Sequence, residues 1–244
     1  MYLLYLDDYH LDDLLYVPSL AQQMGRMRRM RPVCLFVHSS GDQAERLLEA
    51  EGLFPERKDG LVQAQTPEEA ALVERALRQV NRRVVGALTE EGVHAVGFRG
   101  ADRGLLQVDD DGAVKPGRVA WLKDLIEKRA VPVISALARE LEGEGTRAVL
   151  AGEATVALAR ALGLGEMVVV FFTRNNQPGV FEGQRPLPNL PLDALPPAIL
   201  PDPEAVRAVV TAGIPALLTS AAGLFSADEP RGTTIFNVKT AKKG

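Results

Sequence analysis

The sequence predicts an α/β fold, a three-layer αβα sandwich around a mainly parallel central sheet. Short apolar runs alternate along the chain with amphipathic segments of helical spacing, the order expected of parallel strands joined by crossover helices. The run Met167–Thr173, MVVVFFT, is apolar without alternation, which suits a parallel strand covered on both faces. With 244 residues, 46% of them hydrophobic, the chain is long enough to bury such a core.

Composition and charge exclude several classes of protein. The formal net charge is −4 and the basic residues are dispersed, so we expect no nucleic-acid partner. No apolar run approaches the ~20 residues of a membrane span, and the first residues lack the pattern of a secretory signal. The single cysteine, Cys34, can form no internal disulfide. His10, His38 and His94 lack partners at metal-ligand spacing, so we expect no metal site. Without a predicted span or secretory signal, the expected location is the cytoplasm.

The chain begins with a predicted strand over Tyr2–Leu6, which leads into the acidic stretch Asp7–Asp13. We interpret these acids as a solvated turn. A divalent-cation site is the alternative, although the pattern is not that of a calcium loop. A helix over Leu14–Met30 follows, with apolar residues at helical spacing and arginines near its end, where cations favour the helix dipole.

The segment Arg31–Ala50 is the one around which the chain is organised. It reads as a buried strand over Pro32–Val37, a turn over Ser39–Gly41 and a helix over Asp42–Ala50. The free amides of a first helical turn can bind an anion. This turn holds serines where a phosphate-binding loop would have glycines, so the predicted anion site is weakened, and an ordinary strand-to-helix turn is the alternative.

A long helix is predicted from Thr66 to Gly92. Thr66 is a capping residue, Pro67 occupies the first helical position, and two glutamates follow in the first turn. The length of this helix suggests a major packing or dimer element. We expect the preceding stretch, Phe54–Gln65, to be irregular and the following stretch, Val93–Phe98, to form a strand.

The remaining predicted elements are shorter. They are a hairpin of Leu105–Val108 and Ala113–Val114, a helix over Trp121–Arg129, a strand over Val131–Ser135, a helix over Gly152–Leu162, a helix over Ala205–Thr211, and strands over Pro215–Thr219 and Thr233–Val238. The stretch Arg185–Pro203 holds most of the prolines, and we expect an ordered but irregular connection there.

This order of segments resembles the amino-acid kinase superfamily, and most closely acetylglutamate kinase and its acetylaminoadipate kinase relatives. The turn at 37–41, Val-His-Ser-Ser-Gly, resembles the family's valine-histidine-glycine-glycine-glycine turn. Residues 66–106 resemble the family's long helix, strand and glycine loop, with Asn81 at the centre of the helix. The helix over Thr155–Gly163, the strand after it and the closing Gly232-Thr233 are also similar. The resemblance covers nearly the whole chain.

The resemblance implies where ligands would bind. In that family the first half of the chain binds the acetylated amino acid and the second half binds ATP with Mg²⁺. It therefore divides this chain into a substrate-side half, residues 1–148, and a shortened nucleotide-side half, residues 149–244, which share one sheet. The substrate-binding positions that it implies are His38, Ser39, Ser40, Gly41 and Gln63, and the nucleotide-binding positions are Thr173, Arg174 and Gly179.

The resemblance also implies that most groups needed for phosphoryl transfer have been replaced. The family uses two lysines, an orienting aspartate and a substrate arginine, because charge on the transferring group must be met by fixed cations and donors. The first lysine begins a lysine-any-glycine-glycine motif, the second falls near Asp202, and the aspartate falls near Glu153. That motif matches Tyr5, Leu6, Asp7 and Asp8. The arginine follows a glycine-leucine pair, but here Gly60-Leu61 is followed by Val62 and Gln63, so that cation is expected to be missing. The candidate catalytic positions are Tyr5, Asp7, Asp8, Glu153 and Asp202.

Three functions remain open from the sequence. The leading hypothesis is a non-catalytic binding or regulatory protein linked to arginine or lysine biosynthesis, which binds a small acylated amino acid. The alternative is an active kinase that phosphorylates the carboxylate of an N-acylated amino acid such as N-acetylglutamate, with Arg174, Arg99 or Arg103 as its cations. ATP and Mg²⁺ would be its cofactors. The third is a structural homodimer through the Thr66–Gly92 helix, or a heteromer with a related active kinase.

Overall fold

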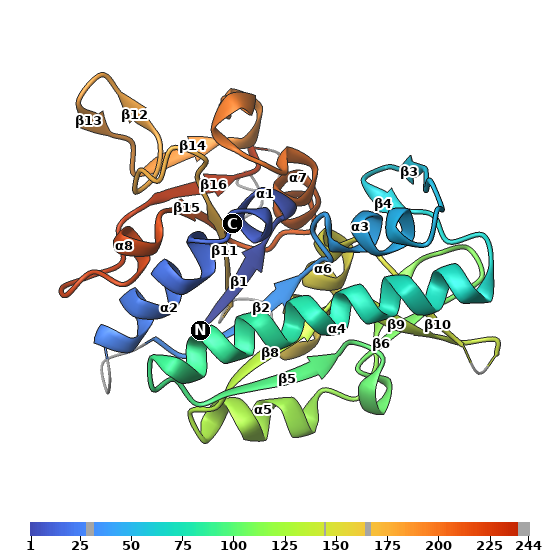
Figure 1. Cartoon of the computed structure of the whole chain (residues 1–244). Helices are drawn as coiled ribbons and strands as arrows, with labels where there is room; N and C mark the ends of the chain where they lie inside the picture. Colours follow the sequence, from blue (N-terminus) through green and yellow to red (C-terminus); the bar gives the residue numbers. More distant parts are fainter. Residues whose placement is uncertain (28–31, 144, 164–166, 239–244) are drawn as a thin grey trace.

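The computed structural model describes residues 1–27, 32–143, 145–163 and 167–238. Within these residues, eight strands form the central sheet in the order β14-β16-β15-β11-β1-β2-β8-β5 (Figure 1). The strands of this sheet are β1 (Tyr2–Leu6), β2 (Cys34–His38), β5 (Ala95–Arg99), β8 (Val131–Ser135), β11 (Val168–Phe172), β14 (Asn189–Pro191), β15 (Ala216–Thr219) and β16 (Thr233–Phe236).

The sheet is parallel from β5 through β15, and β16 returns antiparallel to β15. β1 is a central strand, with β2 on one side and β11 on the other, and its residues alternate between the two faces. Leu3 and Tyr5 enter one hydrophobic cluster, whereas Leu4 and Leu6 enter the other. Both faces are therefore buried, and the predicted mainly parallel sandwich is confirmed.

Helices cover both faces of the sheet (Figure 1). α2, α4 and α8 contribute to the cluster on one face, and α5, α6 and α7 to the cluster on the other. The helices of the described residues are α1 (Asp8–Asp12), α2 (Tyr16–Arg26), α3 (Gln43–Ala50), α4 (Pro67–Glu90), α5 (Ala120–Glu127), α6 (Ala151–Leu162), α7 (Pro203–Thr211) and α8 (Ala221–Leu224). Met30 and Arg31, at the borders of two predicted segments, lie outside the described residues.

The long helix α4 begins as predicted. Thr66 caps it, because its hydroxyl accepts a hydrogen bond from the Glu69 amide at 3.2 Å. Its buried stripe at three- and four-residue spacing lies on the sheet and against α3: Val73, Ala76, Leu77, Val80, Val84 and Leu88. This packing accounts for the length of the helix, and its role in a dimer stays a prediction.

A second, smaller sheet has the order β10-β9-β6-β7. Its strands are β6 (Leu106–Val108), β7 (Val114–Pro116), β9 (Leu137–Glu140) and β10 (Thr146–Ala148). The antiparallel pairing of β6 with β7 confirms the predicted hairpin. The β9–β10 pair was not predicted, because β9 follows β8 after a single residue and the two strands read as one apolar run.

Two predicted irregular stretches contain further structure. Arg57–Lys58 (β3) and Leu61–Val62 (β4) form a small hairpin within 54–65. The stretch Arg185–Pro203 is mostly irregular, as predicted, although it includes β14 and one strand of the hairpin between β12 (Phe181–Glu182) and β13 (Arg185–Pro186). None of the helices in 1–27, 32–143, 145–163 and 167–238 is both long and apolar enough to cross a membrane.

The interpretation of the acidic stretch as a solvated turn was wrong for the buried Asp7 and for the backbone of 8–12, which forms α1, whereas Asp12 and Asp13 are exposed as expected. Asp7 is buried and caps the short helix α1, since its carboxylate accepts a hydrogen bond from the His10 amide at 2.9 Å. The same carboxylate contacts His10 Nδ1 at 2.8 and 2.9 Å. α1 thereby lies directly beyond the end of β1, above the sheet edge described next.

Candidate functional site

The candidate site lies where three parallel strands end together. Leu6, His38 and Ser135 are register partners at the carboxyl ends of β1, β2 and β8. α1 follows the first of these strands, and the turn Ser39–Gly41 with α3 follows the second. Loops beyond the carboxyl ends of parallel strands are the usual place for ligands in such sheets.

His38 is held by the protein through both ring nitrogens. Nδ1 lies 2.7 Å from the Ser39 carbonyl, which can only accept, so Nδ1 donates. Nε2 accepts from the Asn81 amide at 3.0 Å, and the same amide donates to the Val133 carbonyl at 2.9 Å. Burial lowers the pKa of His38 to about 4, so the ring is neutral at pH 7. His38 therefore orients the end of β2 and has no free nitrogen for the predicted substrate contact.

The turn after β2 is occupied by acids of the chain itself. The Ser39 hydroxyl donates to the carboxylate of Asp8, and the amide of Asp42 donates to that of Asp12 at 2.9 Å. The backbone of Gly41, with φ of +56°, packs against the Asp12 carboxylate, and a Cβ at this position would lie 2.5 Å from one of its oxygens. Internal carboxylates thus take two of the donors that the sequence offered for an anion.

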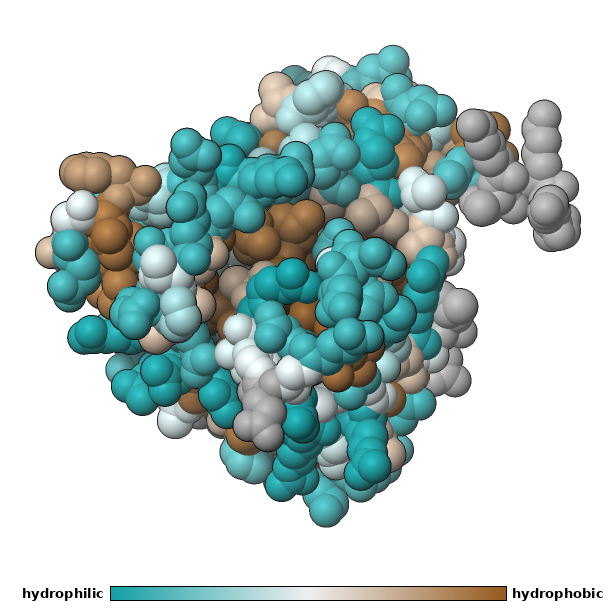
Figure 2. All heavy atoms as spheres, turned by 90° about the vertical axis from the view of Figure 1, so that its right-hand side faces the viewer, coloured by the Kyte–Doolittle hydropathy of each residue, from teal (hydrophilic) through white to brown (hydrophobic). Residues whose placement is uncertain are grey.

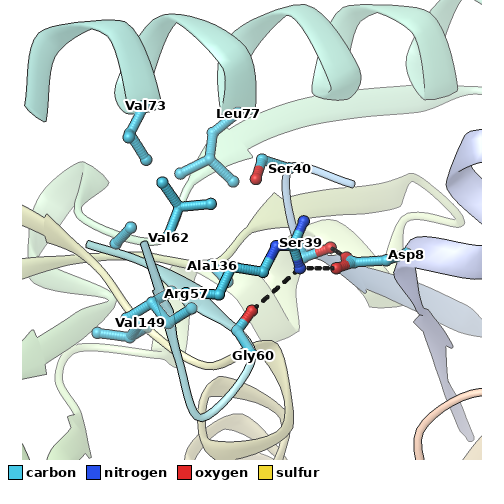
Figure 3. A pocket seen from close by; sticks show the side chains of 12 residues that line it. Asp8, Ser39, Ser40, Arg57, Gly60, Val62, Val73, Leu77, Ala136 and Val149 are labelled. Carbon is cyan, nitrogen blue, oxygen red and sulfur yellow. Dashed lines mark hydrogen bonds and ion pairs between the residues drawn. The ribbon is translucent and has the colours of Figure 1, made fainter. Parts of the chain in front are cut away.

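Arg57 brings a cation to this place that the sequence analysis missed. Its Nη1 donates to Asp8 at 2.8 Å (Figure 3). Its Nε and Nη2 donate to the two oxygens of Glu45 at 2.7 and 3.0 Å. The hydrogen bond with Glu45 raises the pKa of Arg57 above its usual value. The β3–β4 hairpin positions this side chain, and its turn at Asp59-Gly60, with φ of 53° and 87°, matches a common hairpin signal.

A cavity lies beneath the β3–β4 hairpin (Figure 3). Asp8, Ser39, Ser40 and Arg57 form its polar side. Its apolar walls come from Leu61, Val62, Val73, Leu77, Ala136, Ala148 and Val149. A neighbouring groove of about 190 Å³ shares Leu61, Val62, Val73 and Ala148 with it. The face containing the hairpin is hollowed, with hydrophobic side chains in the hollow and hydrophilic ones around it (Figure 2).

Two other predicted substrate-side residues have local partners. The Ser40 hydroxyl is 3.4 Å from the Gly41 carbonyl and faces the cavity. Gln63 lies on the groove, where its side chain donates to the Leu61 carbonyl at 3.1 Å. Both residues therefore line a hollow of the surface, and their role in substrate binding stays a prediction.

Tyr5 and Asp202, two candidate catalytic residues that are 197 positions apart, meet on the face of β1 that α6 and α7 cover. The Tyr5 hydroxyl donates to the Asp202 carboxylate, which also caps α7 by accepting from the Ala205 amide at 2.9 Å. Burial raises the pKa of Tyr5 well above its usual value, and Asp202 acts in the same direction. Tyr5 is therefore a protonated donor at neutral pH.

The remaining catalytic candidates are not part of that pair. Asp7 points to the other face, where its partner His10 packs against the rings of Tyr16 and Phe172. Glu153 lies exposed in the first turn of α6. The structure thus divides the five candidates into the pair Tyr5–Asp202, Asp8 at the cavity, and two separate acids.

The predicted nucleotide-side residues shape the loop after β11. The Thr173 hydroxyl donates to the Gln177 carbonyl at 2.7 Å, and Gly179, with φ of +107°, packs against Thr233. Arg174 donates through Nε to the Leu200 carbonyl at 3.2 Å, and its guanidinium lies 5.1 Å from the centre of the Tyr9 ring. Each side chain has a structural partner.

Two alternative cations also have partners elsewhere. Arg99, at the end of β5, pairs with Glu74 at 3.0 Å and with Asp102 at 2.7 Å. Arg103 lies 5.3 Å from the centre of the Trp121 ring. Among the described residues, no group of three or more histidine, cysteine, aspartate or glutamate side chains is arranged to hold a metal ion.

Comparison with known proteins identifies the family. The sequence model of the Amino acid kinase family matches residues 10–220. The chain belongs to the amino acid kinase family. It is 34% identical to the acetylglutamate kinase of Roseiflexus sp. (strain RS-1) over 180 residues, which are 70% of this chain and 66% of that protein. It is 32% identical to the acetylglutamate kinase of Paenarthrobacter aurescens (strain TC1) over 158 residues, 55% of this chain and 50% of that protein.

The chain therefore spans about half to two thirds of the length of these two acetylglutamate kinases. Solved structures support the amino acid kinase fold. The crystal structure of smu.665 from Streptococcus mutans UA159 superimposes with a TM-score of 0.66 at 19% identity, and the match covers 96% of this chain and 98% of that one.

In this member of the amino acid kinase family, replacing Tyr5 by Phe is expected to lower the free energy of unfolding by about 2 kcal/mol. The variant removes the hydroxyl that donates to Asp202 and leaves a carboxylate oxygen without that donor. Urea unfolding at pH 7 measures the change. Tyr2→Phe, at the start of the same strand, is the control and should change stability by less than about 0.5 kcal/mol. Equal changes in the two variants would contradict a role for the hydrogen bond.

Proposed function

We propose that this chain is a non-catalytic member of the amino acid kinase family. It keeps the sandwich, has lost phosphoryl transfer, and acts as a binding or regulatory protein linked to arginine or lysine biosynthesis. The observation that carries the proposal is the hydrogen bond between Tyr5 and Asp202. The resemblance implies a lysine at each of these positions, and here the two side chains satisfy each other instead of facing a phosphoryl group.

The charges near the strand ends support the proposal. Asp8 and Asp12 lie on the short stretch after β1 and contact the turn after β2, where a polyphosphate would approach. Two like charges ~4 Å apart repel by about 4 kcal/mol at an effective dielectric constant near 20. Arg57 is the basic residue among the described residues that line the cavity, and two carboxylates already hold it. These residues do not fit a bound polyphosphate.

The cavity supports a binding function. The cavity holds about 30 Å³, room for a carboxylate beside Ser39, Ser40 and Arg57, and the neighbouring groove of about 190 Å³ offers an apolar surface for the rest of a small acylated amino acid. The identity with proteins named acetylglutamate kinase favours this class of ligand.

The alternative is an active kinase for the carboxylate of an N-acylated amino acid such as N-acetylglutamate, with ATP and Mg²⁺. The observation that favours this alternative is the exposed side chain of Arg174, a candidate cation in the loop after β11. This alternative requires the guanidinium to leave the Tyr9 ring and the Leu200 carbonyl.

A turnover assay separates the two functions. The purified protein, at high concentration, is incubated with ATP, Mg²⁺ and N-acetyl-L-glutamate, and ADP release is followed beside an acetylglutamate kinase as the positive control. We expect a rate lower by roughly a thousandfold or more, since loss of even one group that stabilises the transition state costs about 10²–10³. Turnover comparable to the control kinase, together with calorimetric binding of Mg²⁺-ATP, would instead establish the alternative.

The proposed partners are a second copy of the chain, joined through α4, or a related active kinase. The supporting observation is the 24-residue length of α4, which exceeds that of the other described helices. Light scattering of the protein alone, and mixed with an acetylglutamate kinase, measures both. A monomer in both samples would contradict this part of the proposal.

A further inference from the structure

We propose that Asp8 is a built-in plug of the cavity beneath the β3–β4 hairpin. Its carboxylate takes the donors that an incoming carboxylate ligand would use, and it holds the hairpin closed through Arg57. This inference rests on the proposed binding function and adds to it a mode of regulation, in which ligand and Asp8 compete for the same donors.

The contacts of Asp8 carry the inference. One carboxylate oxygen accepts from the Ser39 hydroxyl, and the other accepts from Arg57 Nη1 at 2.8 Å (Figure 3). The two donors come from different elements, the turn after β2 and the β3–β4 hairpin. Asp8 lines the cavity together with both of them. A carboxylate gripped at both oxygens by a hydroxyl and a guanidinium is the arrangement expected of a bound acid.

Asp8 is not needed for the local fold. The cap of α1 is Asp7, and Asp8 is the first helical residue after it. Arg57 keeps its place without Asp8, because Glu45 holds it through two hydrogen bonds and the carbonyls of Gly41 and Gly60 lie 3.3 Å from its nitrogens. Removing the Asp8 carboxylate therefore frees Nη1 and the Ser39 hydroxyl and takes away one anchor of the hairpin, while Glu45 and the two carbonyls keep Arg57 in place.

The plug defines which ligands can enter. A ligand binds in the cavity only if its own carboxylate replaces that of Asp8 as the acceptor of the Ser39 and Arg57 hydrogen bonds. The rest of the ligand would then lie in the neighbouring groove of about 190 Å³, against Leu61, Val62, Val73 and Ala148, which line both hollows. An internal competitor divides the affinity constant of the ligand by a factor equal to the inverse of the fraction of molecules in which the site is free. When the plug is in place in nine molecules of ten, its removal raises the affinity about tenfold.

The test compares the wild-type protein with Asp8→Ala by isothermal titration calorimetry with N-acetyl-L-glutamate in the absence of ATP. We expect the variant to bind at least about tenfold more tightly. Asp13→Asn is the matched control, because it removes one charge from the same stretch at a residue outside the cavity lining, whose carboxylate accepts from the Leu15 amide at 2.9 Å. Its affinity should stay within twofold of wild type. Equal gains in both variants, or no gain in a folded Asp8→Ala, would overturn the plug.

A second variant and a second measurement guard against a folding defect. If circular dichroism shows Asp8→Ala to be unfolded, Asp8→Asn replaces it, and a gain in the same direction is expected. Hydrogen exchange should also show faster exchange of the Gln63 amide, which donates to the Glu56 carbonyl at 2.9 Å across the hairpin. Unchanged exchange of the Gln63 amide would contradict the role of Asp8 in holding the hairpin. ADP release by the wild-type protein would contradict the non-catalytic function and leave the calorimetric result standing.

Discussion

Lowering the pH from 7 to 4 is expected to destabilise the wild-type protein by about 3 kcal/mol more than a His38→Asn variant. Burial lowers the pKa of His38 from 6.5 to about 4, so in this window the unfolded chain binds a proton that the folded protein does not. The stabilising contribution of the neutral ring is complete above pH 6.5, and it is lost as the pH falls toward 4. Each pKa unit corresponds to about 1.4 kcal/mol.

Urea unfolding of both proteins at several pH values between 7 and 4 measures this difference. His94→Gln is the control, because His94 is exposed and its substitution should leave the pH dependence of stability unchanged. The His38→Asn protein should be less stable than wild type at pH 7, and the gap should narrow in acid. Parallel pH curves for wild type and His38→Asn would show that His38 is not the group that titrates.

The second large effect is expected from Gly179→Ala, which should lower the free energy of unfolding by about 3 kcal/mol. The backbone at Gly179 has φ of +107°, and a Cβ would lie 2.5 Å from Thr233 Oγ1 and 2.8 Å from its amide nitrogen. That hydroxyl accepts from the Val180 amide at 2.8 Å and donates to the Leu187 carbonyl at 2.6 Å, so it has no room to move. Unfavourable φ costs about 1–2 kcal/mol, and overpacking adds about 1–3.

Gly183→Ala is the matched control for this prediction. Gly183 also has a positive φ, of 61°, but nothing lies within 4 Å of a Cβ built there. It should therefore lose only about 1 kcal/mol, from the backbone alone. Thermal unfolding of the two variants measures the difference, and similar losses would mean that the contact with Thr233 is unimportant.

Much of the fold follows from local patterns. Thr66 and Pro67 mark the start of α4 because capping and a fixed φ act within one turn, and the apolar run at β11 shows a strand covered on both faces. The short helix α1 was missed because a row of acids suggests exposure. Its signal was Asp7 three residues before His10, a capping position followed by a partner in the first turn.

The site was harder to predict than the fold. The resemblance named Tyr5 and Asp202 separately, but only the three-dimensional arrangement brings them together across 197 residues. Arg57 was passed over because the expected arginine was sought after Leu61, on the other strand of the hairpin. The Asp59-Gly60 dipeptide predicts a two-residue turn, and a hairpin drawn from it places Arg57 opposite Val62.

The central place of β1 has a consequence for synthesis of the chain. Tyr2 leaves the ribosome 166 residues ahead of Val168 on β11, which is its neighbour on one side in the folded sheet. At about 5–20 residues per second, that partner emerges roughly 10 to 30 s later. Until then one edge of the nascent sheet has no neighbouring strand, and such an edge invites pairing with other chains. Variants that slow elongation before residue 168 should therefore yield more aggregated protein without changing the stability of the molecules that fold.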